Sequence, residues 1–348
     1  MSATRFPRRA VLRALGGFPA PALARFAAPA LPMAAGLVGS AGVAFAADAW
    51  PTRPVTVIAP FTPGGPVDVL ARVVAQGVQA ASGQPATVDN RTGAQGNIGI
   101  EAVRRAAPDG HTLLLVPAGN LTINPTLMSN LPFDVERDLA PVSLLATAPN
   151  VIVCDPALPV RDLPGLVSYA KSRPEGVTYA SPGVGSQLHL AGELLAQKAG
   201  IGMLHVPYRG SSQAVTDVIS GQVQLLFTNL PAVLTAIRGG QVRAMALTTA
   251  ARSPIAPEIP TLEELGVPGF DITSWYGLLA PRATPAPVLE AIHAEMRRVL
   301  HAPATSAALT AQGLTITDEG LDEFGRRIRT ETAMWAEVIR SRNIQSGL

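Results

Sequence analysis

The chain has 348 residues, of which 47% are hydrophobic and 15% charged. This balance excludes an intrinsically disordered protein and leaves room for two domains. The formal net charge is only +2, and no cluster of Lys and Arg with interleaved aromatic residues occurs, so nothing indicates a nucleic-acid-binding protein. A single cysteine, Cys154, excludes an internal disulfide.

The first 46 residues have the pattern of an export signal. They contain five Arg and no acidic residue, and an apolar stretch rich in Ala, Gly and Pro runs on to Ala44-Phe45-Ala46. This pattern predicts cleavage before Ala47, and Arg8-Arg9 resembles a twin-arginine signal. A membrane anchor over residues 26–47 is the alternative, against which the prolines and glycines of that stretch argue. Cleavage would leave 22 basic and 25 acidic residues, a net charge of −3.

From Trp50 onward, short apolar runs alternate with helical patterns, which predicts an α/β protein with mostly parallel sheets. The predicted strands are 55–59, 112–116, 150–153, 225–228 and 244–248, and the predicted helices are 66–81, 187–199, 211–220, 285–301 and 320–343. No long linker separates these elements. We therefore expect two lobes joined by crossing strands, with a ligand site between them. One lobe would comprise residues 47–150 and 272–348, and the other residues 151–271.

A loop of glycine and proline, residues 60–66, connects the first predicted strand to the first predicted helix. Free backbone N–H groups and the positive end of the helix dipole at such a turn favour an anion. The loop lacks both the lysine of a P-loop and the G-x-G-x-x-G spacing. A tight connection without any ligand remains an alternative.

A second loop of the same kind, residues 181–186, follows a strand that ends near Ala180 and precedes a helix that begins near Gln187. Ser186 is a suitable N-cap, and its hydroxyl is available to local N–H groups or to a ligand. Two such turns on opposite lips of one cleft would direct two helix N-termini at one anion.

Catalytic and metal-binding patterns find little support. The five histidines form no H-x₃-H or H-E-x-x-H pair, and no second cysteine is present, so we predict neither a metal nor a cofactor. Ser186 does not lie in a G-x-S-x-G motif, and nothing nearby in the sequence marks a base for Ser186 or Ser181. We predict that the protein is not an enzyme and keep a serine-type hydrolase as an alternative.

Seven ordered motifs carry a resemblance to a known family. They are PFTPGGPVD (60–68), DNRTGAQGNIG (89–99), APDGHTL (107–113), SPGVGSQLHL (181–190), HVPYRG (205–210), GQV (221–223) with NLP (229–231), and IPT (259–261) followed by Glu264. The sequence resembles the periplasmic solute-binding receptors of tripartite tricarboxylate transporters, the Bug family, over residues 50–345.

The resemblance implies a type II-like periplasmic binding protein fold, with two lobes, two crossing strands and both glycine-rich loops holding a ligand carboxylate. The implied partners are a small carboxylate and the integral membrane subunits of the transporter. It implies a monomer in the periplasm. The ligand contacts that it implies are Phe61, Thr62, Gly64, Gly65, Asp68, Ser181, Gly185, Ser186, His189, Tyr208 and Asn229.

Several positions leave other interpretations open. Asp68 could instead cap its own helix, and His189 could be packed beneath the cleft. Val67, Thr228 and Gln224 stand where the family often has a hydroxyl or an acidic residue, and the missing acids favour a simple carboxylate over an amino acid. A sensor that presents its ligand to a signalling protein needs the same bound surface as a transport receptor.

Overall fold

The computed structural model describes residues 50–208 and 210–345. The predicted export signal, its cleavage site and its arginine pair lie outside this range. In the described residues, no helix is both long enough and apolar enough to span a membrane.

The first sheet has six strands in the order β11-β4-β10-β3-β1-β2. They are β1 (Val55–Ile58), β2 (Ala86–Asp89), β3 (Thr112–Pro117), β4 (Leu139–Ala148), β10 (Ser274–Pro281) and β11 (Thr315–Ile316). The apolar, β-branched run of β1 is buried and pairs in parallel with β2 and β3, whereas β10 lies antiparallel between β3 and β4.

The second sheet has five strands in the order β7-β6-β8-β5-β9. They are β5 (Asn150–Cys154), β6 (Val177–Ser181), β7 (Met203–Pro207), β8 (Leu225–Asn229) and β9 (Arg243–Leu247). Strand β6 is parallel to both β7 and β8, and β5 is antiparallel to both β8 and β9.

The prediction of mostly parallel sheets is therefore wrong, because both sheets are mixed. The cause is the path of the chain. Strand β4 of the first sheet leads through Pro149 directly into β5 of the second, and the chain later returns to the first sheet as β10. Strands that enter a sheet from the other sheet run against those of its own βα units. The predicted strands and helices are present, with ends that differ by no more than two residues.

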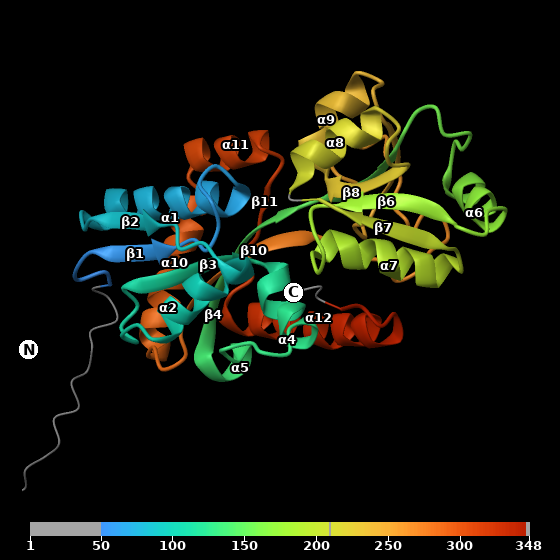
Figure 1. Cartoon of the computed structure of the whole chain (residues 1–348). Coiled ribbons are helices and arrows are strands. Elements are labelled where there is room, and N and C mark those ends of the chain that lie inside the picture. Colours follow the sequence, from blue (N-terminus) through green and yellow to red (C-terminus); the bar gives the residue numbers. More distant parts are fainter. Residues whose placement is uncertain (1–49, 209, 346–348) are drawn as a thin grey trace, which may run out of the picture. The chain divides into compact units, whose positions relative to one another are not determined.

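Helices cover both faces of each sheet (Figure 1). They are α1 (Pro66–Ser82), α2 (Asn97–Arg104), α3 (Ala118–Thr122), α4 (Asn124–Leu127), α5 (Val135–Asp138), α6 (Leu163–Lys171), α7 (Gln187–Ala199), α8 (Ser211–Ile219), α9 (Leu230–Arg238), α10 (Ala286–Leu300), α11 (Pro303–Ala311) and α12 (Leu321–Ser341). Helices α1 and α10 pack on one face of the first sheet, while α8 and α9 pack on one face of the second.

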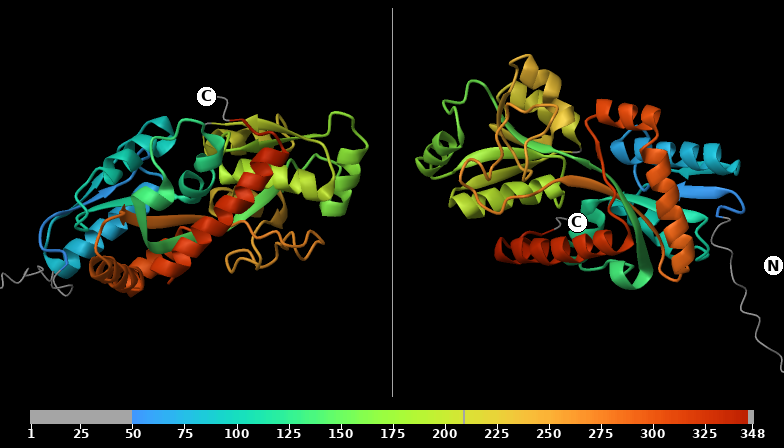
Figure 2. Two further views of the ribbon diagram at one scale, coloured as in Figure 1. Left: turned by 90° about the horizontal axis from the view of Figure 1, so that it is seen from below. Right: turned by 180° about the vertical axis from the view of Figure 1, so that it is seen from behind.

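The last long helix, α12, contacts the cores of both sheets (Figure 2). Phe324 and Ile328, near its start, are buried with side chains of the first sheet. Trp335, Val338 and Ile339, near its end, are buried with side chains of the second sheet and α7. The distribution of strands supports the predicted division into lobes, which stays a prediction, but α12 serves as a second physical connection between the two sheets.

Candidate ligand-binding site

A cavity of about 870 Å³ is lined by residues from both sheets. Its lining consists of Phe61, Gln95, residues 117–120, Asn124, residues 182–188, Pro207, Tyr208, Asn229 and residues 274–276. Most of these residues directly follow the carboxyl ends of β1, β3, β6, β7 and β8. Loops at the carboxyl ends of parallel strands are the usual ligand sites of α/β proteins, and the volume suits a small molecule.

Of the predicted contacts, five line the cavity: Phe61, Gly185, Ser186, Tyr208 and Asn229. Six others, Thr62, Gly64, Gly65, Asp68, Ser181 and His189, do not line it. Sequence reasoning missed Gln95, Asn120, Gln187 and Ser274. Gln95 lies within the 89–99 motif and Ser274 begins β10, where the chain was expected to return to the first lobe, but the sequence singled out neither residue as a ligand contact.

Asp68 holds the first loop in shape. Its Oδ2 accepts the Gly64 N–H at 3.0 Å and the Arg72 Nε–H at 2.9 Å, and its Oδ1 accepts Asn90 Nδ2–H at 3.0 Å. Asn90 also donates to the carbonyl oxygen of Phe61 at 3.1 Å. Chiefly because of the Arg72 hydrogen bond, the pKa of the Asp68 carboxyl is lowered to about 2, so it is ionised at neutral pH.

Neutral groups hold the second loop. The Ser186 hydroxyl accepts the His189 N–H at 3.1 Å as an N-cap and donates to the Gly183 carbonyl at 2.8 Å. The Gly185 N–H donates to Nδ1 of His189 at 3.1 Å. This bond requires His189 to be unprotonated at Nδ1. Burial lowers the pKa of His189, in agreement with that requirement.

His205 lies directly under His189, with the two rings stacked at a centroid distance of 3.8 Å. Its Nε2 is 2.7 Å from the hydroxyl oxygen of Ser181. Burial, followed by the neighbouring His189, lowers the pKa of His205 to about 3. The Ser181 and His205 pair has the spacing of a nucleophile and its base. However, Ser181 is fully buried and outside the cavity lining, so the pair is arranged to support the loop.

Polar side chains link the points where the chain passes between the sheets. Asn229 Nδ2 donates to Asn150 Oδ1 at 2.7 Å and to Ser274 Oγ at 3.0 Å, and Ser274 Oγ–H donates to the same Asn150 oxygen at 2.9 Å. Asn150 Nδ2 donates to the carbonyl oxygen of Ile272. This cluster fixes the floor of the cavity where β5, β8 and β10 begin or end.

Three departures from the family pattern do not reach the cavity. Val67 is buried in α1, Thr228 is fully buried in β8, and Gln224 accepts the Thr178 N–H at 2.9 Å. The predicted influence of these positions on ligand choice therefore finds no support. No Asp or Glu is among the lining residues in 50–208 and 210–345. The same residues contain no group of three or more His, Cys, Asp or Glu that could hold a metal ion.

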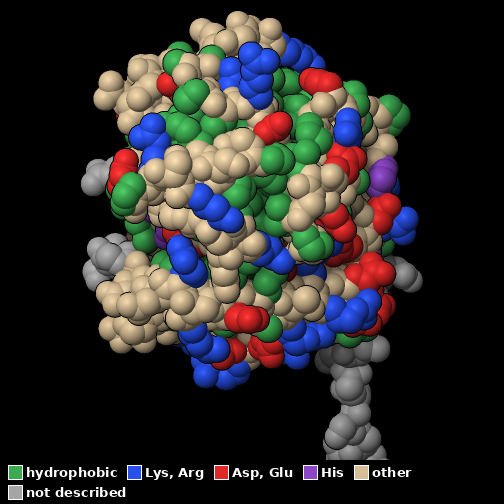
Figure 3. All heavy atoms as spheres, turned by 90° about the vertical axis from the view of Figure 1, so that its right-hand side faces the viewer, with side chains coloured by type: hydrophobic (Ala, Val, Ile, Leu, Met, Phe, Trp, Pro, Cys, Tyr) green, Lys and Arg blue, Asp and Glu red, His purple; other side chains and the backbone are tan. Residues whose placement is uncertain are grey.

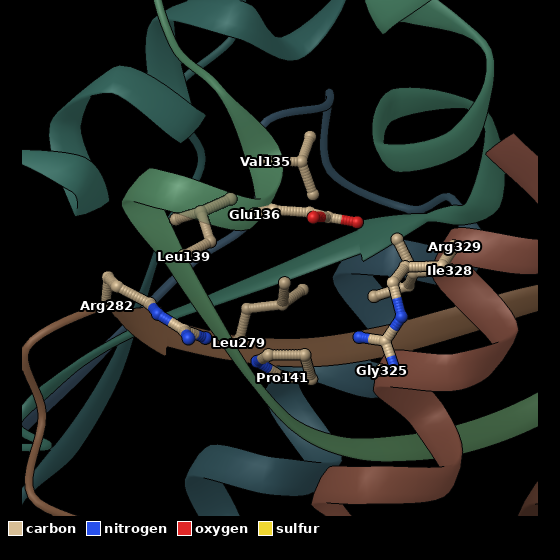
Figure 4. A pocket seen from close by; sticks show the side chains of 9 residues that line it. All are labelled: Val135, Glu136, Leu139, Pro141, Leu279, Arg282, Gly325, Ile328 and Arg329. Carbon is tan, nitrogen blue, oxygen red and sulfur yellow. The ribbon is translucent and has the colours of Figure 1, made fainter.

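Smaller hollows lie away from this cavity. A crevice of about 120 Å³ is bordered by the exposed Glu136, Arg282 and Arg329 above an apolar floor that includes Leu279 and Pro141 (Figure 4). A groove of about 430 Å³ runs between α6 and residues 265–268. Hydrophobic side chains also gather on the face at the α6 end of the molecule (Figure 3).

Comparison with known proteins gives the family. The pattern of the tripartite tricarboxylate transporter family receptor matches residues 70–344. The chain is 39% identical to protein BugT of Bordetella pertussis over 306 residues, which are 87% of this chain and 94% of BugT.

Solved structures agree with the sequence comparison. Rpa4515 of R. palustris with adipate is 33% identical and superposes with a TM-score of 0.75 over 85% of this chain and 99% of that one. MatC (Rpa3494) from Rhodopseudomonas palustris with bound malate is 31% identical, with a TM-score of 0.71 over 83% of this chain and 100% of that one. The fold is thus the two-lobed α/β fold of periplasmic binding proteins. This chain belongs to the tripartite tricarboxylate transporter receptor family.

Proposed function

We propose that this receptor captures a small carboxylate in the cavity between its two sheets and delivers it to the integral membrane subunits of a tripartite tricarboxylate transporter. The observation that carries the proposal is the pair of glycine-rich loops, each of which precedes a long helix, α1 or α7. The first loop lines the cavity only through Phe61, and the second through residues 182–188, which include the first residues of α7. The N–H groups and the dipole at the start of α7 favour an anion.

The energy of a contact between a charge and a helix N-terminus is too small to account for binding without enclosure of the ligand. A contact between a charge and a helix N-terminus contributes about 0.3–1 kcal/mol when exposed and up to about 2 kcal/mol when partly buried. Micromolar affinity requires about −8 kcal/mol. Direct hydrogen bonds and enclosure by apolar walls, such as Phe61 and Tyr276, must supply the rest. A ligand that contacts both loops favours the arrangement in which they are close together.

The described lining contains no carboxylate, so it offers no oppositely charged partner for a ligand ammonium group. We therefore propose a carboxylate without an amino group, such as the adipate or malate that the two R. palustris relatives hold. A receptor of this kind works outside the cytoplasm as a monomer and performs no bond-making step.

A thermal-shift and calorimetry screen tests the proposal. The chain from Ala47 is titrated with adipate, malate, hexanoate and glutamate, and with the neutral diamide of adipic acid. For one micromolar ligand at millimolar concentration, binding should add about 4 kcal/mol to the free energy of unfolding. We expect stabilisation by an acid, none by the amide and little by glutamate. Equal stabilisation by acid and amide would contradict an anion receptor, and tight binding of glutamate would contradict the exclusion of amino acids.

A further inference from the structure

The segment that joins β2 to α2 has an unusual backbone. Four successive residues have positive φ angles: Gly93 at 124°, Ala94 at 45°, Gln95 at 55° and Gly96 at 93°. The left-handed region is easy for glycine but strained for residues with a Cβ. Ala94 and Gln95 account for two of the three non-glycine residues with positive φ in the described chain. Backbone strain of this kind often occurs at ligand-binding sites.

Groups of the cavity wall hold this segment in place. Asn120 Nδ2 donates to the carbonyl oxygen of Gln95 at 2.8 Å, and the Gly96 N–H donates to the Gly93 carbonyl at 2.9 Å. A Cβ on Gly96 would lie only 2.9 Å from Asn120 Nδ2 and 3.3 Å from Phe61 Cζ. Since Asn120 and Phe61 both line the cavity, the segment is tied to the ligand site itself.

Gln95 is the member of the strained segment that lines the cavity. Its side chain is exposed, and its hydrogen bond with Asn120 uses the backbone carbonyl rather than the side-chain amide. The neighbouring Ala94 is equally exposed but does not line the cavity. A glycine at position 95 would adopt the same backbone without strain, whereas glutamine presents two N–H donors and one acceptor to the ligand space.

On the basis of the proposed function, we infer that Gln95 is a specificity-determining residue that recognises a second oxygen-bearing group of the ligand. In the proposed function, the loop at Gly183–Ser186 and the helix α7 receive the first carboxylate from the side of the second sheet, while Gln95 lies between β2 and α2 on the side of the first sheet. An amide N–H₂ donates to either oxygen of a carboxylate. The receptor should therefore prefer a dicarboxylate to a monocarboxylate of equal chain length, because only the former satisfies both ends.

Two probes of equal length, adipate and hexanoate, separate this inference from the proposed function. Their affinities are measured by calorimetry for the wild type, for Gln95→Ala and for Gln95→Glu. Gln95→Ala removes the amide, and Gln95→Glu replaces its donors with a charged acceptor. We expect the wild type to bind adipate at least tenfold more tightly than hexanoate. Both variants should bind adipate at least tenfold more weakly than the wild type, and Gln95→Glu should lose more than Gln95→Ala. The affinity of Gln95→Ala for hexanoate should fall by less than threefold.

Ala94→Gly is the matched control, because it relieves strain in the same segment without removing a group that lines the cavity. Ala94→Gly should bind both probes with the affinities of the wild type. The thermal unfolding midpoint of each variant without ligand shows whether that variant is folded. Unchanged adipate affinity in Gln95→Ala, or equal losses for both probes, would overturn the inference and leave the proposed function standing. Equal affinity of the wild type for hexanoate and adipate would also overturn the inference and leave the proposed function standing. Failure of the wild type to bind any carboxylate would overturn both.

Discussion

The two glycine-rich loops form the same kind of turn, but a charged side chain holds the first and a neutral side chain holds the second. In each loop, a glycine N–H donates to a side chain four residues later: Gly64 to Asp68, and Gly185 to His189. In the first loop the acceptor is a carboxylate whose charge is balanced by Arg72. In the second it is an unprotonated imidazole stacked on His205. A charged acceptor and a neutral acceptor can thus hold the same kind of turn. The shared glycine pattern therefore does not determine which side chain accepts the glycine N–H.

The largest contrast between the loops is steric. A Cβ on Gly185 would lie 2.3 Å from Leu127 Cδ2, at a residue with φ of 74°, whereas nothing lies within 4 Å of a Cβ on Gly64, which has φ of 91°. Gly185→Ala should cost about 3 kcal/mol of unfolding free energy from strain and overpacking, and Gly64→Ala about 1 kcal/mol from strain alone. Leu127 of α4 is buried with side chains of the second sheet and α7, so the added methyl group also disturbs the core beneath the second loop.

Urea denaturation and calorimetry with adipate check this contrast. We expect Gly185→Ala to lose more than tenfold in affinity and Gly64→Ala much less. Gly65 has φ of −81° and only the Thr62 carbonyl, at 4.0 Å, near its Cβ position, so Gly65→Ala serves as the neutral control. Equal effects of Gly64→Ala and Gly185→Ala would show that the contact with Leu127 is unimportant.

Removal of the Asp68 charge from the first loop should have the next largest effect on stability. In Asp68→Asn, the amide replaces one acceptor oxygen with a donor, so Gly64, Arg72 and Asn90 can no longer all be satisfied. We expect the free energy of unfolding to fall by about 1–2 kcal/mol, as measured by urea denaturation. Because Asp68 does not line the cavity, adipate affinity should fall only through loosening of the loop. A loss of binding without a loss of stability would instead indicate direct contact with the ligand.

The loops should also differ in their response to acid. The pKa values of His189 and His205 are lowered in the folded protein, so the unfolded chain binds protons more readily as pH falls below about 6.5. The stability that these neutral rings contribute is therefore present above that pH and is lost on acidification. The corresponding loss for Asp68 begins only near its unfolded pKa of about 4 and is complete only below its folded pKa of about 2.

The double variant His189→Gln with His205→Gln isolates this effect. Urea midpoints of the variant and the wild type are compared at pH 7.5, 6.5 and 5.5. We expect the variant to be less stable at pH 7.5 and the gap to narrow as pH falls. Glu331, whose pKa burial raises to about 7, changes stability in the opposite direction over this range but is common to both proteins. A constant gap would show that the rings do not resist protonation. Glu193 and Arg342, which are paired near His189, are unchanged in the variant.

The smallest effect is expected at Arg72, which is about half exposed at its side chain. Exposed ion pairs contribute little because water and salt screen them. Arg72→Gln should lower the urea midpoint only slightly and raise the pKa of Asp68 by a correspondingly small amount, since the Arg72 hydrogen bond is the main cause of its lowering and the two changes are linked. Titration of the Asp68 carboxyl by NMR measures this change. An unaltered pKa would assign the lowering to Gly64 and Asn90 instead.

The sequence by itself determined the strand–loop–helix units, because local apolar periodicity and glycine placement specify them without distant contacts. Helix α7 was predicted at residues 187–199 as observed, and both loops were identified from the glycines that precede α1 and α7. The family motifs also placed Phe61, Gly185 and Ser186, which line the cavity.

Only the tertiary structure decided which polar groups face the ligand space and which brace a loop. Asp68, Ser181 and His189 lie in the motifs, yet none of them lines the cavity. Asp68 and His189 accept glycine N–H groups of their loops, and Ser181 contacts His205. Gln95, which lies within the 89–99 motif, and Ser274 line the cavity although the sequence singled out neither of them as a ligand contact. Partners such as Asn120 for Gln95, 25 residues apart, are set by long-range packing. The mixed strand directions have the same origin, because they depend on where the chain crosses between sheets and not on the residues of each strand.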